Sequence, residues 1–230
     1  MTHPVDVNAV ELRFRRRAAV DERVPDMFAD LFGRLKAVAS LVASPSMEPP
    51  ILDLGAGESA AANLTPLLVA QFSGAVSFAS RLPKAIRDRA VSDDVLILHI
   101  RRDQADTRLL ALEVFPAVID AFQPYRASAV ADMEEDLNDF EAICEEAQRT
   151  GRDVDGRDSV FKIQQIDFFD DELYRRSFGK SAQDVAQIVS GHVASAQTIG
   201  NGVLVTLMPS TLADGEANER SKAVLKLLGA

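Results

Sequence analysis

The stretch that indicates the fold most directly is Val10-Glu-Leu-Arg-Phe-Arg15, in which apolar and charged side chains alternate. In an extended chain, Leu12 and Phe14 lie on one side and the charged side chains lie on the other. This period of two is typical of a β-strand that buries one face in the core. We therefore expect a first, half-buried strand here.

A long amphipathic helix is expected directly after this strand, from about Asp21 to Val42. Its apolar residues recur at intervals of three and four positions, which gathers them on one helical face. Pro25 suits the first turn of such a helix, because no backbone partner is needed there. The apolar positions are Val24, Met27, Phe28, Leu31, Phe32, Leu35, Val38 and Val42.

Further strands are expected where short apolar or alternating runs occur. The run from Asp94 to Ile100 is apolar on both faces, so we expect it in the middle of the sheet. The other predicted strands lie at residues 51–54, 75–80, 126–131, 160–168 and 202–208.

Further helices are expected where apolar residues return with helical spacing. Within 109–122, Pro116 must either kink the helix or begin a second piece. Ser181 and Asp184 form a capping box that would open a helix ending at Gly200. The remaining predicted helices cover residues 64–72, 132–149 and 217–228.

These elements predict an α+β fold, with a mixed, largely antiparallel sheet flanked by amphipathic helices. Strands and helices do not alternate regularly, as they would in a doubly wound parallel sheet. The 230 residues are enough for one domain with a sizeable core. We expect a single domain over 1–230, and only the proline-containing stretch 44–50 resembles a linker that could divide it.

The composition is ordinary for a globular protein except for its acidity. The formal net charge is −10 and the isoelectric point is about 4.8. Because phosphate recognition needs clustered Lys and Arg, we expect neither nucleic acid nor a membrane as a partner. The lone Cys144 cannot form an internal disulfide, and no stretch resembles a signal peptide or a membrane span. We therefore expect a cytoplasmic protein.

Carboxylates are concentrated in two segments, 132–146 and 167–172, and the first contains no Lys or Arg. Such a surface steers a basic partner and contributes specificity. Two other interpretations are a solvated face and a metal or acid–base site, although no His or glycine-shaped loop adjoins the first segment. The predicted partner-binding residues are Asp132, Glu134, Glu135, Asp136, Asp139, Glu141, Glu145, Glu146, Asp167, Asp170, Asp171 and Glu172.

A glycine-rich segment, Ile51-Leu-Asp-Leu-Gly-Ala-Gly-Glu-Ser59, resembles the first motif of class I S-adenosylmethionine methyltransferases. There a strand ends in an acid, and a glycine turn before a helix lets the backbone approach the cofactor. Such an enzyme would use Asp53, Gly55 and Gly57. The next predicted strand ends in Ser80-Arg81 rather than in an acid, so we prefer a plain glycine turn and expect no enzyme activity and no cofactor.

The remaining polar residues show no catalytic or metal-binding pattern. His3, His99 and His192 lie far apart in the sequence, so we expect core or rim positions for them and no metal site. The basic residues of Arg13–Arg17 are the one cationic concentration. We interpret them as a solvated strand edge or as an internal counter-charge, and they are too few to outweigh the net charge.

The order of elements resembles the immunity protein 52 family of bacterial polymorphic toxin systems. Arg13-Phe-Arg-Arg-Arg17 and the helix after it are similar to the family's opening strand and helix. The other similar segments are Gly74-Ala-Val-Ser-Phe78, Asp94 to Ile100, Val118 to Val130, Gly202-Val-Leu-Val-Thr-Leu207 and Asn218-Glu-Arg-Ser-Lys-Ala-Val224.

This resemblance implies a cytoplasmic α+β antitoxin that neutralises a secreted toxin by direct binding, often a nuclease of a type VI secretion system. The acidity agrees, because nucleases tend to carry basic substrate clefts that an acidic surface can occlude. We therefore expect an immunity protein with a cognate toxin as its partner. The methyltransferase and a structural or assembly subunit are the alternatives, and a homodimer is compatible with the sequence.

Overall fold

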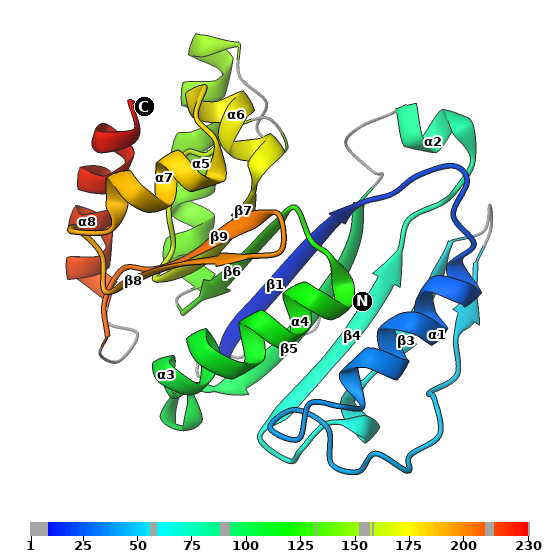
Figure 1. Ribbon diagram of the computed structural model, residues 1–230. Coiled ribbons are helices and arrows are strands. Elements are labelled where there is room, and N and C mark those ends of the chain that lie inside the picture. The colour runs from blue at the N-terminus through cyan, green and yellow to red at the C-terminus, as the bar shows by residue number, and fades with distance from the viewer. Residues whose placement is uncertain are drawn as a thin grey trace.

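A nine-stranded antiparallel sheet organises the molecule, in the order β2-β3-β4-β5-β1-β6-β7-β9-β8 (Figure 1). The computed structural model describes residues 9–55, 59–87, 93–131, 133–151, 157, 159–209 and 214–229. The strands are β1 (Ala9–Arg17), β2 (Asp53–Leu54), β3 (Ala60–Asn63), β4 (Phe72–Phe78), β5 (Asp93–Arg101), β6 (Arg126–Val130), β7 (Ile166–Asp170), β8 (Ser195–Ile199) and β9 (Gly202–Thr206).

Helices lie on both sides of this sheet, which confirms the α+β class. They are α1 (Val24–Leu35), α2 (Pro83–Arg87), α3 (Thr107–Leu109), α4 (Phe115–Phe122), α5 (Met133–Thr150), α6 (Asp171–Phe178), α7 (Ala182–Val189) and α8 (Asp214–Leu228). In Figure 1, α1 and α4 run across the front of the sheet, whereas α5 to α8 gather at its other end. A π-helical segment, Leu110–Val114, joins α3 to α4, and 3₁₀ turns occupy Thr65–Leu67 and Arg102–Gln104.

Two apolar clusters form the core. The first contains α1, α4 and the inward side chains of β1, where the rings of Phe14 and Phe115 lie 5.1 Å apart. The second contains residues of α6, α7 and α8 and includes Phe169 of β7. Successive strand residues point to opposite faces, so Phe168 of β7 belongs to the first cluster and Phe169 to the second.

The first strand confirms the alternation read from the sequence. Val10, Leu12 and Phe14 are fully buried, and β1 occupies the middle of the sheet between β5 and β6. β5 is next to it, as expected for an interior strand. However, β5 buries only one face, because Val95, Ile97 and His99 on its other face are only partly covered.

The predicted helix 21–42 is too long: α1 ends at Leu35. The chain then leaves the helix because Leu41 and Val42 exchange backbone contacts with another segment. Val69 N–H bonds Leu41 O (3.0 Å), and Val42 and Leu68 form an isolated antiparallel bridge. The same contacts replace the expected helix 64–72 with a single 3₁₀ turn.

The predicted strand 160–168 and helix 181–200 also need correction. Only Ile166–Asp170 is a strand, because the Ile163 N–H bonds the hydroxyl of Ser221 in α8 (2.9 Å) instead of a neighbouring strand. The capping box of Ser181 and Asp184 is present, but its helix ends at Val189. Beyond it, Ser195–Ile199 pairs with β9, and Gly200 with φ +55° forms the turn between the two strands.

Three other predictions are confirmed. Pro116 stands in the first turn of α4 and so begins a second helical piece after the π-helical segment. β6 and β9 lie within the ranges expected for them, and the last helix is α8.

Candidate partner interface

The acidic helix α5 carries two exposed carboxylates of the predicted interface. Glu141 and Glu145 are exposed. Asp136 is partly covered, because it accepts a hydrogen bond from Gln164 (3.0 Å) and lies 3.9 Å from a nitrogen of Arg13. Asp132 and the side chains of Glu134, Glu135, Asp139 and Glu146 lie outside the described part of the structure.

Asp167 and Asp170 face inward, which corrects their assignment to a contact surface. Asp167 is fully buried and accepts the Gln164 N–H (2.6 Å), and its burial raises the pKa of the carboxyl to about 6. Asp170 is 5% exposed, and burial raises its pKa as well. It pairs with Arg17 (2.8 Å) and caps α6 by accepting the Leu173 N–H (2.7 Å).

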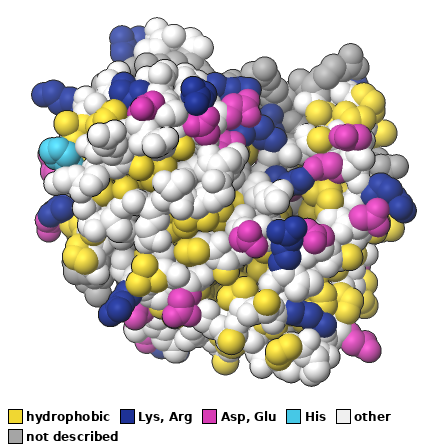
Figure 2. All heavy atoms as spheres, viewed as in Figure 1, with side chains coloured by type: hydrophobic (Ala, Val, Ile, Leu, Met, Phe, Trp, Pro, Cys, Tyr) yellow, Lys and Arg dark blue, Asp and Glu magenta, His cyan; other side chains and the backbone are white. Residues whose placement is uncertain are grey.

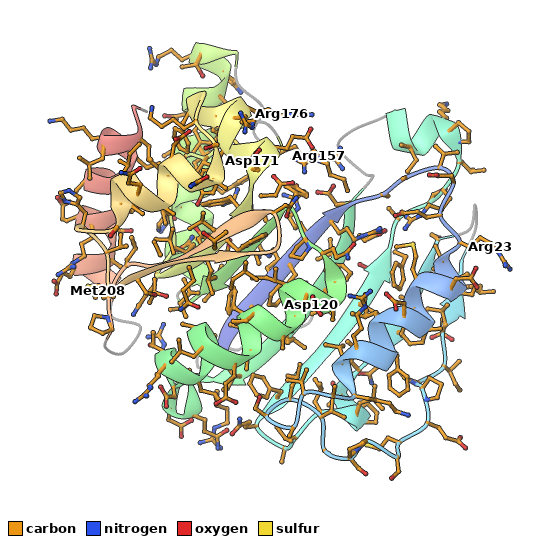
Figure 3. All side chains as sticks on the ribbon, viewed as in Figure 1. Arg23, Asp120, Arg157, Asp171, Arg176 and Met208 are labelled. Carbon is orange, nitrogen blue, oxygen red and sulfur yellow. The ribbon has the colours of Figure 1, made fainter. Side chains whose placement is uncertain are left out.

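Asp171 and Glu172 lie nearer the surface, but arginines of α6 partner both. The Asp171 carboxylate accepts the Ala182 N–H (2.7 Å) and pairs with Arg175 (2.5 Å), and these contacts lower its pKa. Glu172 pairs with Arg176 one helical turn further on. Figure 3 shows Asp171 and Arg176 on α6, at the same end of the sheet as Arg157. Most of the carboxylates of segment 167–172 therefore have a cationic partner.

The basic residues of Arg13–Arg17 act as an internal counter-charge, which was one of the two interpretations of this group. Arg16 pairs with Asp94 (3.1 Å), and Arg15 pairs with Asp93 (2.8 Å). On the face that carries α1 and α4, Figure 2 likewise shows acidic and basic side chains interspersed. Much of the charge counted in the sequence is thus neutralised within the fold.

Asp93 and Asp94 are structural residues that the sequence did not single out. Asp94 is fully buried and accepts two hydrogen bonds of 2.8 Å from the guanidinium of Arg81 and one of 3.0 Å from the Ala79 N–H. Asp93 accepts the Tyr125 hydroxyl (2.8 Å) and pairs with Arg157. The signal available in the sequence was an acidic pair at the start of a strongly apolar strand.

One half of the sheet has an exposed face, turned away from α1 and α4. On β3 and β4 every second side chain is buried in the first core, where Phe78 contacts Phe28 of α1 with their ring centroids 6.3 Å apart. The intervening side chains are exposed and small: Ala61, Asn63, Ser73, Ala75 and Ser77. We call these five residues the open face. Sequence alternation indicated a half-buried strand here, but only the fold shows that no described helix covers this side.

The described residues on either side of positions 56–58 in the glycine-rich segment are joined as antiparallel strands at the edge of the sheet. Asp53 pairs with Ala61 on the antiparallel neighbour β3, and the Gly55 N–H bonds Ser59 O (2.7 Å). A methyltransferase motif requires a strand, a turn and then a helix, whereas here a strand follows the turn. The described strands therefore do not support the methyltransferase; the turn itself, with Gly57, lies outside the described residues.

The two described histidines, His99 and His192, lie on different elements. His99 is 43% exposed, and its Nε2 lies 3.4 Å from Glu11. His192 stands exposed in the turn after α7 rather than on an apolar helix face, and His3 lies outside the described residues. Within the described ranges, no three His, Cys, Asp or Glu side chains are grouped as metal ligands, and no helix is long and apolar enough to cross a bilayer.

No protein-family model matches this chain, and no curated protein matches it. Among solved structures, Pseudomonas aeruginosa T6SS protein PA0821 is similar to it with a TM-score of 0.53 and 11% sequence identity. The similarity covers 96% of this chain and 74% of that chain. The likeness is one of fold. The assignment to the immunity protein 52 family accordingly stays a proposal.

Proposed function

We propose that this chain is an immunity protein that binds a cognate toxin in the cytoplasm and neutralises it without turnover of its own. The toxin would belong to a type VI or related secretion system and would act as a nuclease. The observation that carries the proposal is the exposed acidity of α5. The buried carboxylates Asp93, Asp94 and Asp170 pair with arginines, whereas Glu141 and Glu145 on α5 are exposed.

An exposed acidic helix beside an uncovered sheet suits a protein partner. A basic active-site cleft would be attracted to α5 at long range, which raises the rate of association. The open face offers small side chains against which a partner surface can pack closely. The fold shared with a T6SS protein supports this role, as does the resemblance to immunity proteins in the order of elements.

The direct test is coexpression with the product of the adjacent gene in a bacterial host. We expect that product alone to arrest growth and this chain to restore growth, with a stable complex of the two proteins by size-exclusion chromatography. Protection without a complex would contradict neutralisation by binding. If the chain forms a homo-oligomer and does not protect, an assembly subunit becomes the better explanation.

The double variant Glu141→Lys/Glu145→Lys tests the contribution of α5. We expect slower association with the toxin, and a smaller dependence of the association rate on salt, because fewer exposed carboxylates attract the basic surface. Glu48→Lys/Glu113→Lys is the matched control: both positions are exposed, and the change in net charge is the same. Equal association rates for the two double variants would exclude α5 from the interface.

A further inference from the structure

A small cationic pocket lies between α5 and the middle of the sheet. Its volume is about 150 Å³, and four of its lining side chains are cations. Arg13 and Arg15 come from β1, Arg126 comes from β6, and Lys162 comes from the irregular segment before β7. Among the described residues that line the pocket, Asp136 of α5 is the one carboxylate. Cations thus outnumber carboxylates among the described lining residues, although the protein has a net charge of −10.

The strand register sets two of these cations against each other. Arg15 and Arg126 are directly opposite partners in the antiparallel pair of β1 and β6. Like charges in such a position destabilise a sheet. The register cannot slip to relieve them, because a shift by one residue would turn the core residue Phe14, which is opposite Ala127, out of the first apolar cluster.

Two carboxylates that pair with these arginines, Glu11 and Asp93, do not line the pocket. Arg13 bonds Glu11 (Nη2···Oε1 2.6 Å), and Arg15 shares Asp93 with Arg157. Asp136 is 3.9 Å from Arg13, longer than a hydrogen bond, and Gln164 holds it from the other side. Among the described side chains that line the pocket, an anion would therefore meet four cations and one carboxylate.

We propose that this pocket binds one oxyanion, and that the anion is a side-chain carboxylate of a partner protein. Arginine guanidinium groups pair with carboxylates in a planar, two-point geometry. Phe140, Ile143 and Phe161 line the same pocket and can contact the methylene groups of such a side chain. Asp136 disfavours a doubly charged phosphate more than a singly charged carboxylate. That the carboxylate comes from a partner protein depends on the proposed function. That the pocket binds an anion does not depend on it.

Small probes test the pocket without the toxin. The carboxylate probe is N-acetylglutamate α-amide, whose side chain carries its only ionisable group, and N-acetylglutamine amide is the uncharged control. Amide resonances of Ser128 and Gln164 are followed by NMR during each titration. We expect saturable shifts with the carboxylate probe and none with the control. Equal responses to both probes, or no response, would overturn anion binding by this pocket.

Substituting a cation and substituting the carboxylate of the pocket should change carboxylate affinity in opposite directions. Arg126→Gln and Arg13→Gln should each weaken carboxylate binding by about tenfold, the effect of one charge-assisted hydrogen bond. Asp136→Asn should tighten it, because the repelling carboxylate is gone while the contact with Gln164 can remain. A purely structural role for Asp136 would not produce tighter binding. Arg23→Gln, at a side chain 77% exposed on α1's N-terminal side, is the control and should leave binding unchanged.

Inorganic phosphate distinguishes the source of the anion. If phosphate saturates the same resonances at lower concentration than the carboxylate probe, the pocket is a phosphate site and the assignment to a partner's carboxylate is wrong. If the carboxylate probe binds more tightly, a toxin that fails to bind this chain would contradict the proposed function but not the pocket.

Discussion

At the scale of single residues, the protein encloses charges that a count of the sequence places on its surface. Asp94 and Arg81 form a buried pair, and Asp167 is buried next to Ser128 without a comparable salt bridge. A buried pair is costly to break because the remaining charge is left without compensation. A buried lone carboxyl instead changes its protonation equilibrium. The two aspartates therefore give different predictions.

Asp94→Asn should lower the free energy of unfolding by about 3 kcal/mol, because Arg81 would stay buried with only the more distant Glu22 (3.4 Å) as a counter-charge. Urea unfolding followed by circular dichroism measures this loss. Asp103→Asn is the matched control, since Asp103 is 62% exposed and pairs with Arg101 on the surface. It should cost less than about 1 kcal/mol. Equal losses for the two variants would contradict the structural role of Asp94.

Asp167 should make the protein more stable in mild acid. Burial raises its pKa from 3.8 to about 6, so the folded state binds the proton more tightly than the unfolded state. The resulting stabilisation is complete below about pH 4, is lost as the pH rises through 6, and amounts to about 3 kcal/mol at most. Urea midpoints at pH 7 and pH 4.5 test this: wild type should gain stability relative to Asp167→Asn as the pH falls.

Asp184 provides a control of opposite sign for this pH dependence. Hydrogen bonds from the Ser181 hydroxyl and N–H lower its pKa. Its contribution is therefore present at neutral pH and lost in acid, so wild type should lose stability relative to Asp184→Asn as the pH falls. A pH dependence of the same sign for both variants would contradict the environments described for the two carboxyls.

At the scale of elements, close packing decides which local sequence features the fold tolerates. Gly74 of β4 and Gly33 of α1 are both glycines inside regular structure, but their surroundings differ. A Cβ at Gly74 would lie 2.4 Å from Ile97 O and 2.7 Å from Leu98 Cδ2, whereas a Cβ at Gly33 would meet nothing within 4 Å. Glycine at 74 is thus required by the neighbouring strand β5, while glycine at 33 only weakens its helix.

The same substitution should therefore have opposite effects at these two positions. Gly74→Ala should destabilise the protein by about 1–3 kcal/mol through overpacking. Gly33→Ala should stabilise it by up to about 1 kcal/mol, because alanine is the better helix former. Thermal and urea unfolding of both variants measure the difference. If Gly74→Ala unfolds at the same temperature and urea concentration as wild type, β4 and β5 pack less closely than described.

At the scale of the whole molecule, the two apolar clusters share strands of one sheet. Phe168 and Leu204 belong to the first cluster, and Phe169 and Val205, their neighbours on the same strands, belong to the second. If β7 and β9 unfold, both apolar clusters lose side chains that belong to them. We propose on this basis that residues 1–230 form one domain, and that the stretch 44–50 does not divide it.

A single cooperative unfolding transition is the expected consequence of this arrangement. Leu31→Ala in the first cluster and Val185→Ala in the second should each lower the one transition, with tyrosine fluorescence and circular dichroism changing together. Tyr125 and Tyr174 both belong to the second cluster, so their fluorescence reports on it directly. A Leu31→Ala protein whose tyrosine signal keeps the wild-type midpoint would indicate two independent units.

The sequence alone determined the elements whose pattern is local. Alternation at Val10–Arg15 identified β1, helical spacing identified α1 and α8, and the capping residues Ser181 and Asp184 identified the start of α7. Each of these signals is a direct consequence of backbone geometry and nearby side chains. The acidity of segment 132–146 was likewise visible without a structure.

Only the tertiary structure decided where elements end and which charges remain free. The pairing of Ser195–Ile199 with β9 turned an expected helical segment into a strand, because distant backbone partners outweigh local propensity. Asp167 and Asp170 look like surface residues in the sequence but are buried. Arg15, Arg16 and Arg17 each have a carboxylate partner on a segment far along the chain. Burial and ion pairing depend on contacts between distant residues, and no local pattern encodes them.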